Sequence, residues 1–209
     1  MRIYDGVVSI DLETTGFSPT KNKILEIGVY LFDAKTKEFH VFERVINVGK
    51  VPSHITKITG ISQAEANGGV KLKLALRELK SFIFDRLENP LFVGHNLIKF
   101  DLPFINLPYV APRHVYDTML IERAIHANEI KRTFHATQLD AQTYRGNAVV
   151  NLKMCSKRYK IEQKDAHRAG DDARVTFEVF VNQIKKIGWK LFIVSQKTEK
   201  IQEKGSNQI

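Results

Sequence analysis

The most constraining feature of this chain is a short apolar segment that carries two acids and then ends in a polar turn. Residues 7–16 read Val-Val-Ser-Ile-Asp-Leu-Glu-Thr-Thr-Gly. Asp11 and Glu13 are two positions apart, so on a β-strand both carboxylates point to the same face of the sheet. Two adjacent like charges repel one another, and a shared divalent cation offsets that repulsion. The segment therefore predicts a strand end that carries either two solvated acids or two metal ligands.

Two further segments carry an acid at the expected start of a helix. A short apolar run ends at Gly94, and Asp101 follows it just before Pro103, in a pattern typical of a helix start. Asp172 opens a segment with clear helical periodicity that ends at Gly188. Each of these acids could simply favour the positive end of a helix dipole. Taken with the first segment, they could instead complete one site of four carboxylates.

A histidine precedes the last of these acids by five residues. On one continuous helix, His167 and Asp172 would diverge by about 140°. They can face a single site only if His167 lies in the loop that enters the helix. A neutral imidazole, with an ordinary pKa near 6.5, is well suited to accept a proton from water at neutral pH.

These segments resemble the DEDDh family of 3′–5′ exonucleases, and in particular the DnaQ-like proofreading domains such as the epsilon subunit of DNA polymerase III. The family's first motif, Asp-x-Glu followed by Thr-x-Gly, is matched by residues 11–16. Its second motif, His-Asn followed by Phe-Asp, is matched by residues 95–101. Its third motif, His-x-Ala-x-x-Asp-Ala, is matched by residues 167–173. The resemblance spans roughly residues 5 to 187, with the motifs in the same order.

The resemblance implies a metal-dependent 3′–5′ exonuclease that hydrolyses phosphodiester bonds at single-stranded DNA ends and releases nucleoside 5′-monophosphates. It implies two Mg²⁺ or Mn²⁺ ions held by carboxylates, and a histidine that deprotonates the attacking water. The implied catalytic residues are His167 and the four metal ligands Asp11, Glu13, Asp101 and Asp172. The implied substrate contacts are Thr14, Thr15, Phe17, Thr59, Ile61 and Asn96.

Two alternatives stay open. An RNA-directed 3′–5′ exoribonuclease of the same family would carry the same carboxylates, because the metal site binds the phosphate that DNA and RNA share. A non-catalytic, polymerase-associated nucleic-acid-binding module on the same fold is expected to lack a metal-binding acid, whereas all four are present here. A proofreading role would require a polymerase partner, since a chain of 209 residues is too short to include a polymerase domain.

The link between Asp117 and Asn151 is longer than in the resembling family, which predicts an insertion around residues 128–150. This insertion contains a second histidine and aspartate at the same spacing, His135 and Asp140. We favour His167 as the third-motif histidine, because a long amphipathic helix follows Asp172 whereas a turn signal soon follows Asp140.

Hydrophobic periodicity predicts an α/β fold. Three strands come first, with a hairpin between the second and third, and helices then alternate with short strands. The resemblance identifies the arrangement as a ribonuclease H-like fold, with a mixed five-stranded sheet flanked by helices. The expected strands are 5–11, 23–33, 38–47, 91–94 and 113–117, and the expected helices are 71–87, 102–107, 118–127, 151–159 and 172–187. We expect residues 1–188 to form the exonuclease domain and residues 189–209 to form a partly mobile C-terminal extension.

The composition favours a nucleic-acid partner inside the cell. The net charge of +9 suits a polyanion. Part of the excess lies in residues 153–168, which can be read as an ordinary solvated face or as a track for the phosphate backbone. One cysteine excludes an internal disulfide and fits a reducing, cytoplasmic compartment. No stretch of the sequence is long and apolar enough to span a membrane.

Overall fold

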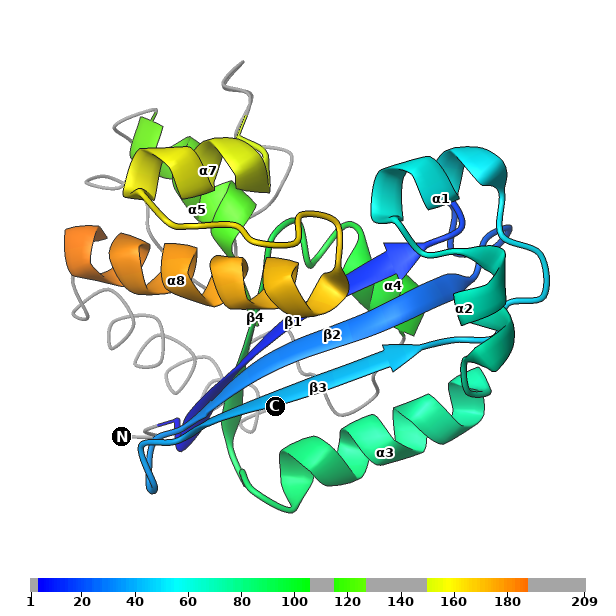
Figure 1. Ribbon diagram of the computed structural model, residues 1–209. Helices are drawn as coiled ribbons and strands as arrows, with labels where there is room; N and C mark the ends of the chain where they lie inside the picture. The colour runs from blue at the N-terminus through cyan, green and yellow to red at the C-terminus, as the bar shows by residue number, and fades with distance from the viewer. Residues whose placement is uncertain (1–3, 106–114, 127–149, 188–209) are drawn as a thin grey trace, which may run out of the picture.

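The computed structural model describes residues 4–105, 115–126 and 150–187, which form a mixed five-stranded sheet with helices on its faces (Figure 1). The strands are β1 (Gly6–Thr14), β2 (Ile24–Asp33), β3 (Phe39–Val45), β4 (Pro90–Gly94) and β5 (Val115–Asp117), in the order β3-β2-β1-β4-β5. β1, β2 and β3 are antiparallel neighbours, whereas β4 runs parallel to both β1 and β5. The helices are α1 (Ser53–Thr59), α2 (Gln63–Gly68), α3 (Leu72–Phe84), α4 (Asp101–Ile105), α5 (Thr118–His126), α7 (Leu152–Tyr159) and α8 (Ala169–Ile187). The predicted α/β class and mixed five-stranded sheet are confirmed.

The side chains of β1 alternate between the two faces of the sheet, and each face packs against a different apolar cluster. Val8, Ile10 and Leu12 are buried in the core that also contains residues of α3. The intervening positions, which include Asp11 and Glu13, point to the opposite face, because successive strand residues alternate between faces. α5 and α8 cover that face through a second apolar cluster. The acids of β1 therefore lie on the side of the sheet where α8 packs.

The start of α8 lies directly against β2 because glycine removes the side chain that would separate them. A Cβ atom added to Gly28 would fall 2.0 Å from the carbonyl carbon of Ala169. A Cβ added to Gly170 would fall within 1.6 Å of a carboxylate oxygen of Glu43 on β3. Gly170, where the resembling family usually has an apolar residue, lies against the flexible, exposed side chain of Glu43, whereas Gly28 lies against backbone atoms that cannot move aside.

The main differences from the expected elements are at the end of β1, at the start of α8, at the end of α3, which stops at Phe84 rather than at residue 87, and in two short helices. β1 continues to Thr14, three residues beyond the expected end at residue 11, so Glu13 lies within the strand together with Asp11. α8 begins at Ala169, three residues earlier than expected from the periodicity. α1 and α2 were not expected as helices, since elements of seven and six residues are too short to show an apolar stripe. Their local signals are the side-chain cap from Ser62 and the left-handed Gly60.

Several expectations lie outside the described residues. They are most of the insertion predicted at 128–150, with His135 and Asp140, and the C-terminal extension 189–209. Among the helices of the described residues, none is long and apolar enough to cross a membrane.

Candidate active site

The first two acid segments meet because β1 extends beyond its neighbour β4. The pairing of these two parallel strands ends at Ser9 and Val93, so the backbone of β1 is free on that side further along. The N–H of Leu12 donates instead to Oδ1 of Asp101 at 3.1 Å. Asp101 is the first residue of α4, and the residue is only 2% exposed. This bond brings Asp101 beside the strand segment that carries Asp11 and Glu13.

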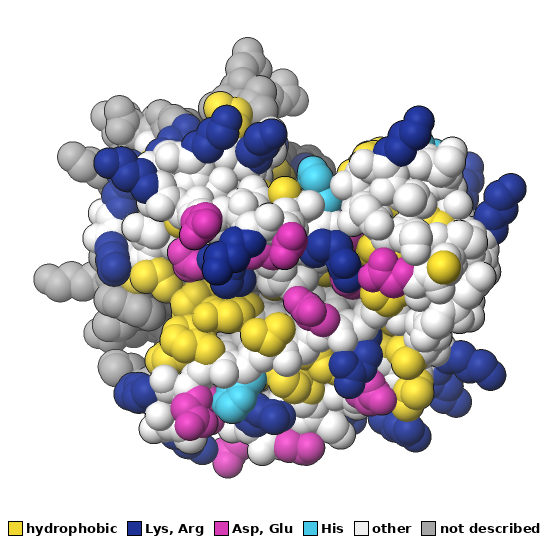
Figure 2. Space-filling view, viewed as in Figure 1, with side chains coloured by type: hydrophobic (Ala, Val, Ile, Leu, Met, Phe, Trp, Pro, Cys, Tyr) yellow, Lys and Arg dark blue, Asp and Glu magenta, His cyan; other side chains and the backbone are white. Residues whose placement is uncertain are grey.

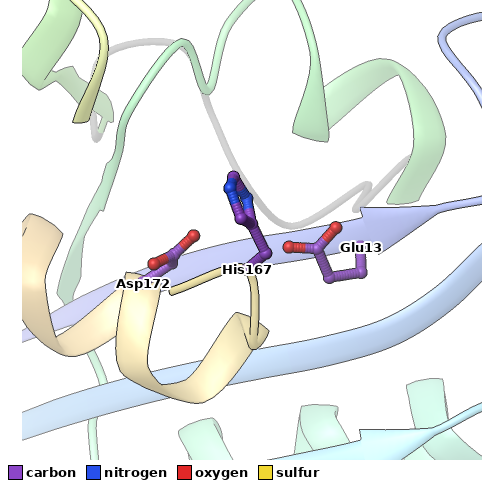
Figure 3. A group of neighbouring side chains, drawn as sticks. All are labelled: Glu13, His167 and Asp172. Atoms are coloured by element: carbon purple, nitrogen blue, oxygen red, sulfur yellow. The ribbon is translucent and has the colours of Figure 1, made fainter. Parts of the chain in front are cut away.

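The third segment completes the group from the other side. One ligand atom from each of Glu13, His167 and Asp172 lies within 4.8 Å of the others. In Figure 3 the imidazole of His167 lies between the two carboxylates, at the point where the loop enters α8. His167 has a φ of 66° and precedes the helix, which begins at Ala169. The requirement that this histidine lie in the loop is met.

The carboxylates of the site disfavour their own ionisation. Burial, together with the charges of Asp101, Asp172 and Glu13, raises the pKa of Asp11 well above its ordinary value. Burial and the neighbouring acids likewise raise the pKa of Glu13 to about 8. The pKa of Asp101 is raised by burial, and so is that of Asp172, although His167 and Gln163 oppose the latter shift. The protein thus brings together acidic groups that hold their protons at pH values where isolated carboxyl groups are ionised.

This donor set fits hard divalent cations. Asp11 and Asp101 lie outside the tight group of Glu13, His167 and Asp172, yet both are close enough to couple to it electrostatically. Carboxylate oxygens are the ligands that Mg²⁺ and Mn²⁺ prefer, and these cations would remove the repulsion that raises the pKa values.

Two neighbours of the site were missed by sequence reasoning. Gln163 donates from Nε2 to Oδ1 of Asp172 at 2.6 Å, although nothing in its loop sequence marks it. Glu26 on β2 is the cross-strand partner of Glu13 and is 1% exposed. A glutamate inside the apolar run of residues 24–29 was a signal that could have identified the latter position.

The turn after β1 uses the hydroxyl groups that were expected to contact substrate. Thr14 donates from Oγ1 to the carbonyl oxygen of Gly16 at 2.7 Å, and Oγ1 of Thr15 accepts from the N–H of Lys23 at 2.9 Å. Phe17 is 89% exposed and meets Phe100 edge to face, with ring centroids 6.3 Å apart. Of the residues expected in this turn, Phe17 alone presents its side chain fully to solvent.

The remaining expected contacts differ in exposure. Asn96 has a left-handed φ of 69°, and its N–H donates to Asp117. Thr59 is buried, and its hydroxyl donates to the carbonyl of Ile55 while it accepts from the N–H of Ile61. Ile61 is fully buried. In this structure Thr59 and Ile61 support the turn after α1, and substrate contact by them stays a prediction.

The basic stretch 153–168 is not uniform. Its lysines Lys153, Lys157, Lys160 and Lys164 are exposed. Arg158 instead forms an ion pair with Glu122, whose side chain is 0% exposed. Figure 2 shows Lys and Arg side chains over α7 and over α1, on either side of a notch in this face.

Comparison with known proteins agrees with this arrangement. The family model described as "RNase_T: Exonuclease" matches residues 8–180. The chain belongs to this exonuclease family. The family groups the DnaQ-like 3′–5′ exonucleases, which are metal-dependent hydrolases.

Individual relatives support the same family and differ in size. The PolC-type DNA polymerase III of Ureaplasma parvum is 31% identical over 184 residues, which are 83% of this chain and 11% of that protein. This chain therefore spans about a tenth of the length of the PolC-type relative. The DNA polymerase III subunit epsilon of Aquifex aeolicus is 25% identical over 206 residues, which are 97% of this chain and 93% of that one. The crystal structure of E. coli exonuclease I with a dA16 oligonucleotide shares the fold, with a TM-score of 0.66, 19% identity, and coverage of 91% of this chain and 42% of that one.

Proposed function

We propose that this chain is a 3′–5′ exonuclease that removes nucleoside 5′-monophosphates from single-stranded DNA ends. The observation that carries the proposal is the convergence of four carboxylates and an exposed histidine from three distant segments of the chain. Burying so many acids together costs free energy, and a site that works on phosphate with bound cations offsets that cost. The catalytic residues proposed are Asp11, Glu13, Asp101, His167 and Asp172.

His167 is the proposed general base. Its imidazole is exposed, so water can reach it, and it lies beside Glu13 and Asp172. In the proposed reaction it accepts a proton from the attacking water, whose oxygen bonds to phosphorus as the bond to the 3′ oxygen of the preceding nucleotide breaks. That 3′ oxygen takes a proton from solvent water and leaves as a hydroxyl group. Asp172 stabilises the imidazolium that forms, since its charge already interacts with His167. The products are a nucleoside 5′-monophosphate and a chain shortened by one nucleotide.

We assign the four carboxylates as ligands of two divalent cations, Mg²⁺ or Mn²⁺. Bound there, the cations would neutralise the phosphate and stabilise charge on the attacking and leaving oxygens. Phe17, which is exposed next to Phe100, is the proposed surface on which a terminal base packs.

DNA is favoured over RNA because relatives along most of the chain are named as subunits or forms of DNA polymerase III. The same relatives favour a polymerase partner and a proofreading role. A solved relative, E. coli exonuclease I, is described in complex with single-stranded dA16 and dT13. An RNA-directed exonuclease remains the second candidate, because the carboxylate site binds the phosphate common to both polymers.

The test is parallel digestion of end-labelled single-stranded DNA, duplex DNA and RNA, each with Mg²⁺ and with chelator. We expect mononucleotides from the 3′ end of single-stranded DNA, produced only with the cation. Faster digestion of RNA would move the assignment to the exoribonuclease. Absence of digestion of all three substrates by the folded protein would refute the proposal.

A further inference from the structure

Arg168 and Glu26 form an ion pair directly beside the candidate site. The guanidinium donates from Nη2 to Oε1 of Glu26 at 2.6 Å, and from Nε to both carboxylate oxygens at 3.2 Å. Glu26 is 1% exposed, whereas the arginine side chain is 38% exposed. A second bond from Nη2 reaches Oε1 of Glu65 on α2 at 3.1 Å. The arginine therefore links the loop before α8 to β2 and α2.

The backbone next to this arginine is held by the same carboxylate. The N–H of Ala169, the first residue of α8, donates to Oε2 of Glu26 at 2.9 Å. The first N–H groups of a helix lack partners within the helix, and an anion there also complements the helix dipole. Glu26 consequently fixes both the side chain of residue 168 and the backbone of residue 169.

His167 immediately precedes these two anchored residues, and its backbone N–H also acts on the carboxylate of Asp172. Its side chain is exposed, so packing does not determine the place of the imidazole. Its φ of 66° lies in the left-handed region, which residues with a side chain adopt uncommonly, so the backbone on both sides must hold it there. Glu26 is the cross-strand partner of Glu13 in the β1–β2 pair. The pairing of the two strands therefore fixes the position of Glu26 relative to the site.

We propose that Arg168, through its bidentate pair with Glu26, is a positioning residue that holds His167 in place to act as the general base. This inference rests on the proposed function for its kinetic test. A guanidinium is required because its planar fork can bond both carboxylate oxygens, whereas a lysine ammonium retains the charge without the fork.

The decisive variant is Arg168→Lys, and the chain offers a matched control. Arg158, on α7, likewise pairs a partly exposed guanidinium with a fully buried glutamate, Glu122 of α5. We expect Arg168→Lys to lower kcat by about 10- to 100-fold, the effect of misplacing a reacting group, with KM changed by less than about twofold. Arg158→Lys is expected to lower the Tm comparably and to leave kcat within about twofold of wild type.

A double variant tests whether the arginine acts through the histidine. If it does, His167→Ala/Arg168→Lys is no slower than His167→Ala alone, because the group being positioned is already absent. Losses that multiply in the double variant would overturn the proposal. So would wild-type kcat in Arg168→Lys, or an equal kcat loss in Arg158→Lys.

A measurement without catalysis separates this inference from the proposed function. We expect the imidazole NMR signals of His167 to shift and broaden in Arg168→Lys and to stay unchanged in Arg158→Lys. Unchanged signals in both variants would refute the positioning role even if the wild-type enzyme is active. An inactive wild-type protein that shows the expected shift would refute the proposed function and keep the positioning role.

Discussion

The acids of the candidate site and the buried Glu122 of α5 have opposite electrostatics. At the candidate site, burial and mutual repulsion raise the pKa of Asp11 and Glu13. Between α5, α7 and α8, burial would raise the pKa of Glu122 as well, but hydrogen bonds from three side chains outweigh it and lower the pKa. The donors are Gln183 at 2.8 Å, Tyr159 at 2.7 Å and Arg158.

The difference teaches how to separate a structural acid from a functional one. Glu122 receives donors on both oxygens from elements that it holds together, so its charge is satisfied within the protein. The acids of the site have one another as neighbours, which raises their pKa values, and a bound divalent cation would offset this repulsion. A buried acid with a raised pKa among other acids therefore marks chemistry, whereas a fully bonded one marks stability.

The largest expected effect comes from removing the cation or one of its ligands. Chelator should abolish exonuclease activity, Mg²⁺ or Mn²⁺ should restore it, and Asp11→Asn should be nearly inactive with the cation present. The variant should remain folded, because the substitution relieves repulsion among the acids. The measurements are nucleotide release and circular dichroism. Full activity in chelator would contradict the proposal that the acids of the site act through a bound cation.

The next effect concerns the general base. His167→Ala should lower the rate by about 10²–10⁴-fold, the usual contribution of a positioned proton acceptor. His135→Ala, the matched variant in the second His–Asp pair, should retain nearly the wild-type rate. Both are compared on one single-stranded substrate near neutral pH. If His135→Ala loses most of its rate and His167→Ala keeps the wild-type rate, the third motif has been assigned to the wrong segment.

Loss of the cation that pairs with Glu122 should lower the stability of the protein rather than its activity. Arg158→Met leaves the charge of Glu122 buried without its cation, and should lower the free energy of unfolding by about 3 kcal/mol. Lys157→Met, at the neighbouring exposed position, should change it by less than about 0.5 kcal/mol. Urea unfolding followed by fluorescence measures both. Equal values for the two variants would contradict the structural role of the pair.

The pH dependence of stability should reveal the site without its cation. The pKa of Glu13 is raised from an ordinary value near 4.5 to about 8, so between these values the folded state holds a proton that the unfolded chain has released. The stabilisation is thus complete below about pH 4.5 and is lost as the pH rises through 8. In chelator, the Tm should fall from pH 5 to 8, and Mg²⁺ should reduce the fall. A Tm that rises over this window in chelator would contradict the raised pKa.

The smallest expected effect concerns the exposed lysines of the basic stretch. Lys157→Gln and Lys164→Gln together should weaken binding of single-stranded DNA and flatten its salt dependence, because fewer phosphates are neutralised. The kcat at saturating substrate should change little. Arg158 is left unchanged in this experiment, since its charge is committed to Glu122. An unaltered salt slope would make the stretch an ordinary solvated surface.

Much of the site followed from local patterns. The two-residue spacing of Asp11 and Glu13 placed both acids on one face of β1, because a strand alternates by steric necessity. The spacing of His167 and Asp172 required a loop before the helix, and the structure has α8 begin between them. These inferences depend on the geometry of a single element, which neighbouring residues determine.

Other features required the tertiary structure. The bond from Leu12 to Asp101 joins residues 89 positions apart, and the pair of Arg168 with Glu26 joins residues 142 apart. Likewise, no local pattern distinguishes Arg158, which pairs with a buried acid, from Lys157, which faces solvent. The sequence by itself determined which residues could do chemistry, because their type and spacing are local properties. Only the packing of distant segments decided which charges are satisfied, because burial and partners are properties of the whole fold.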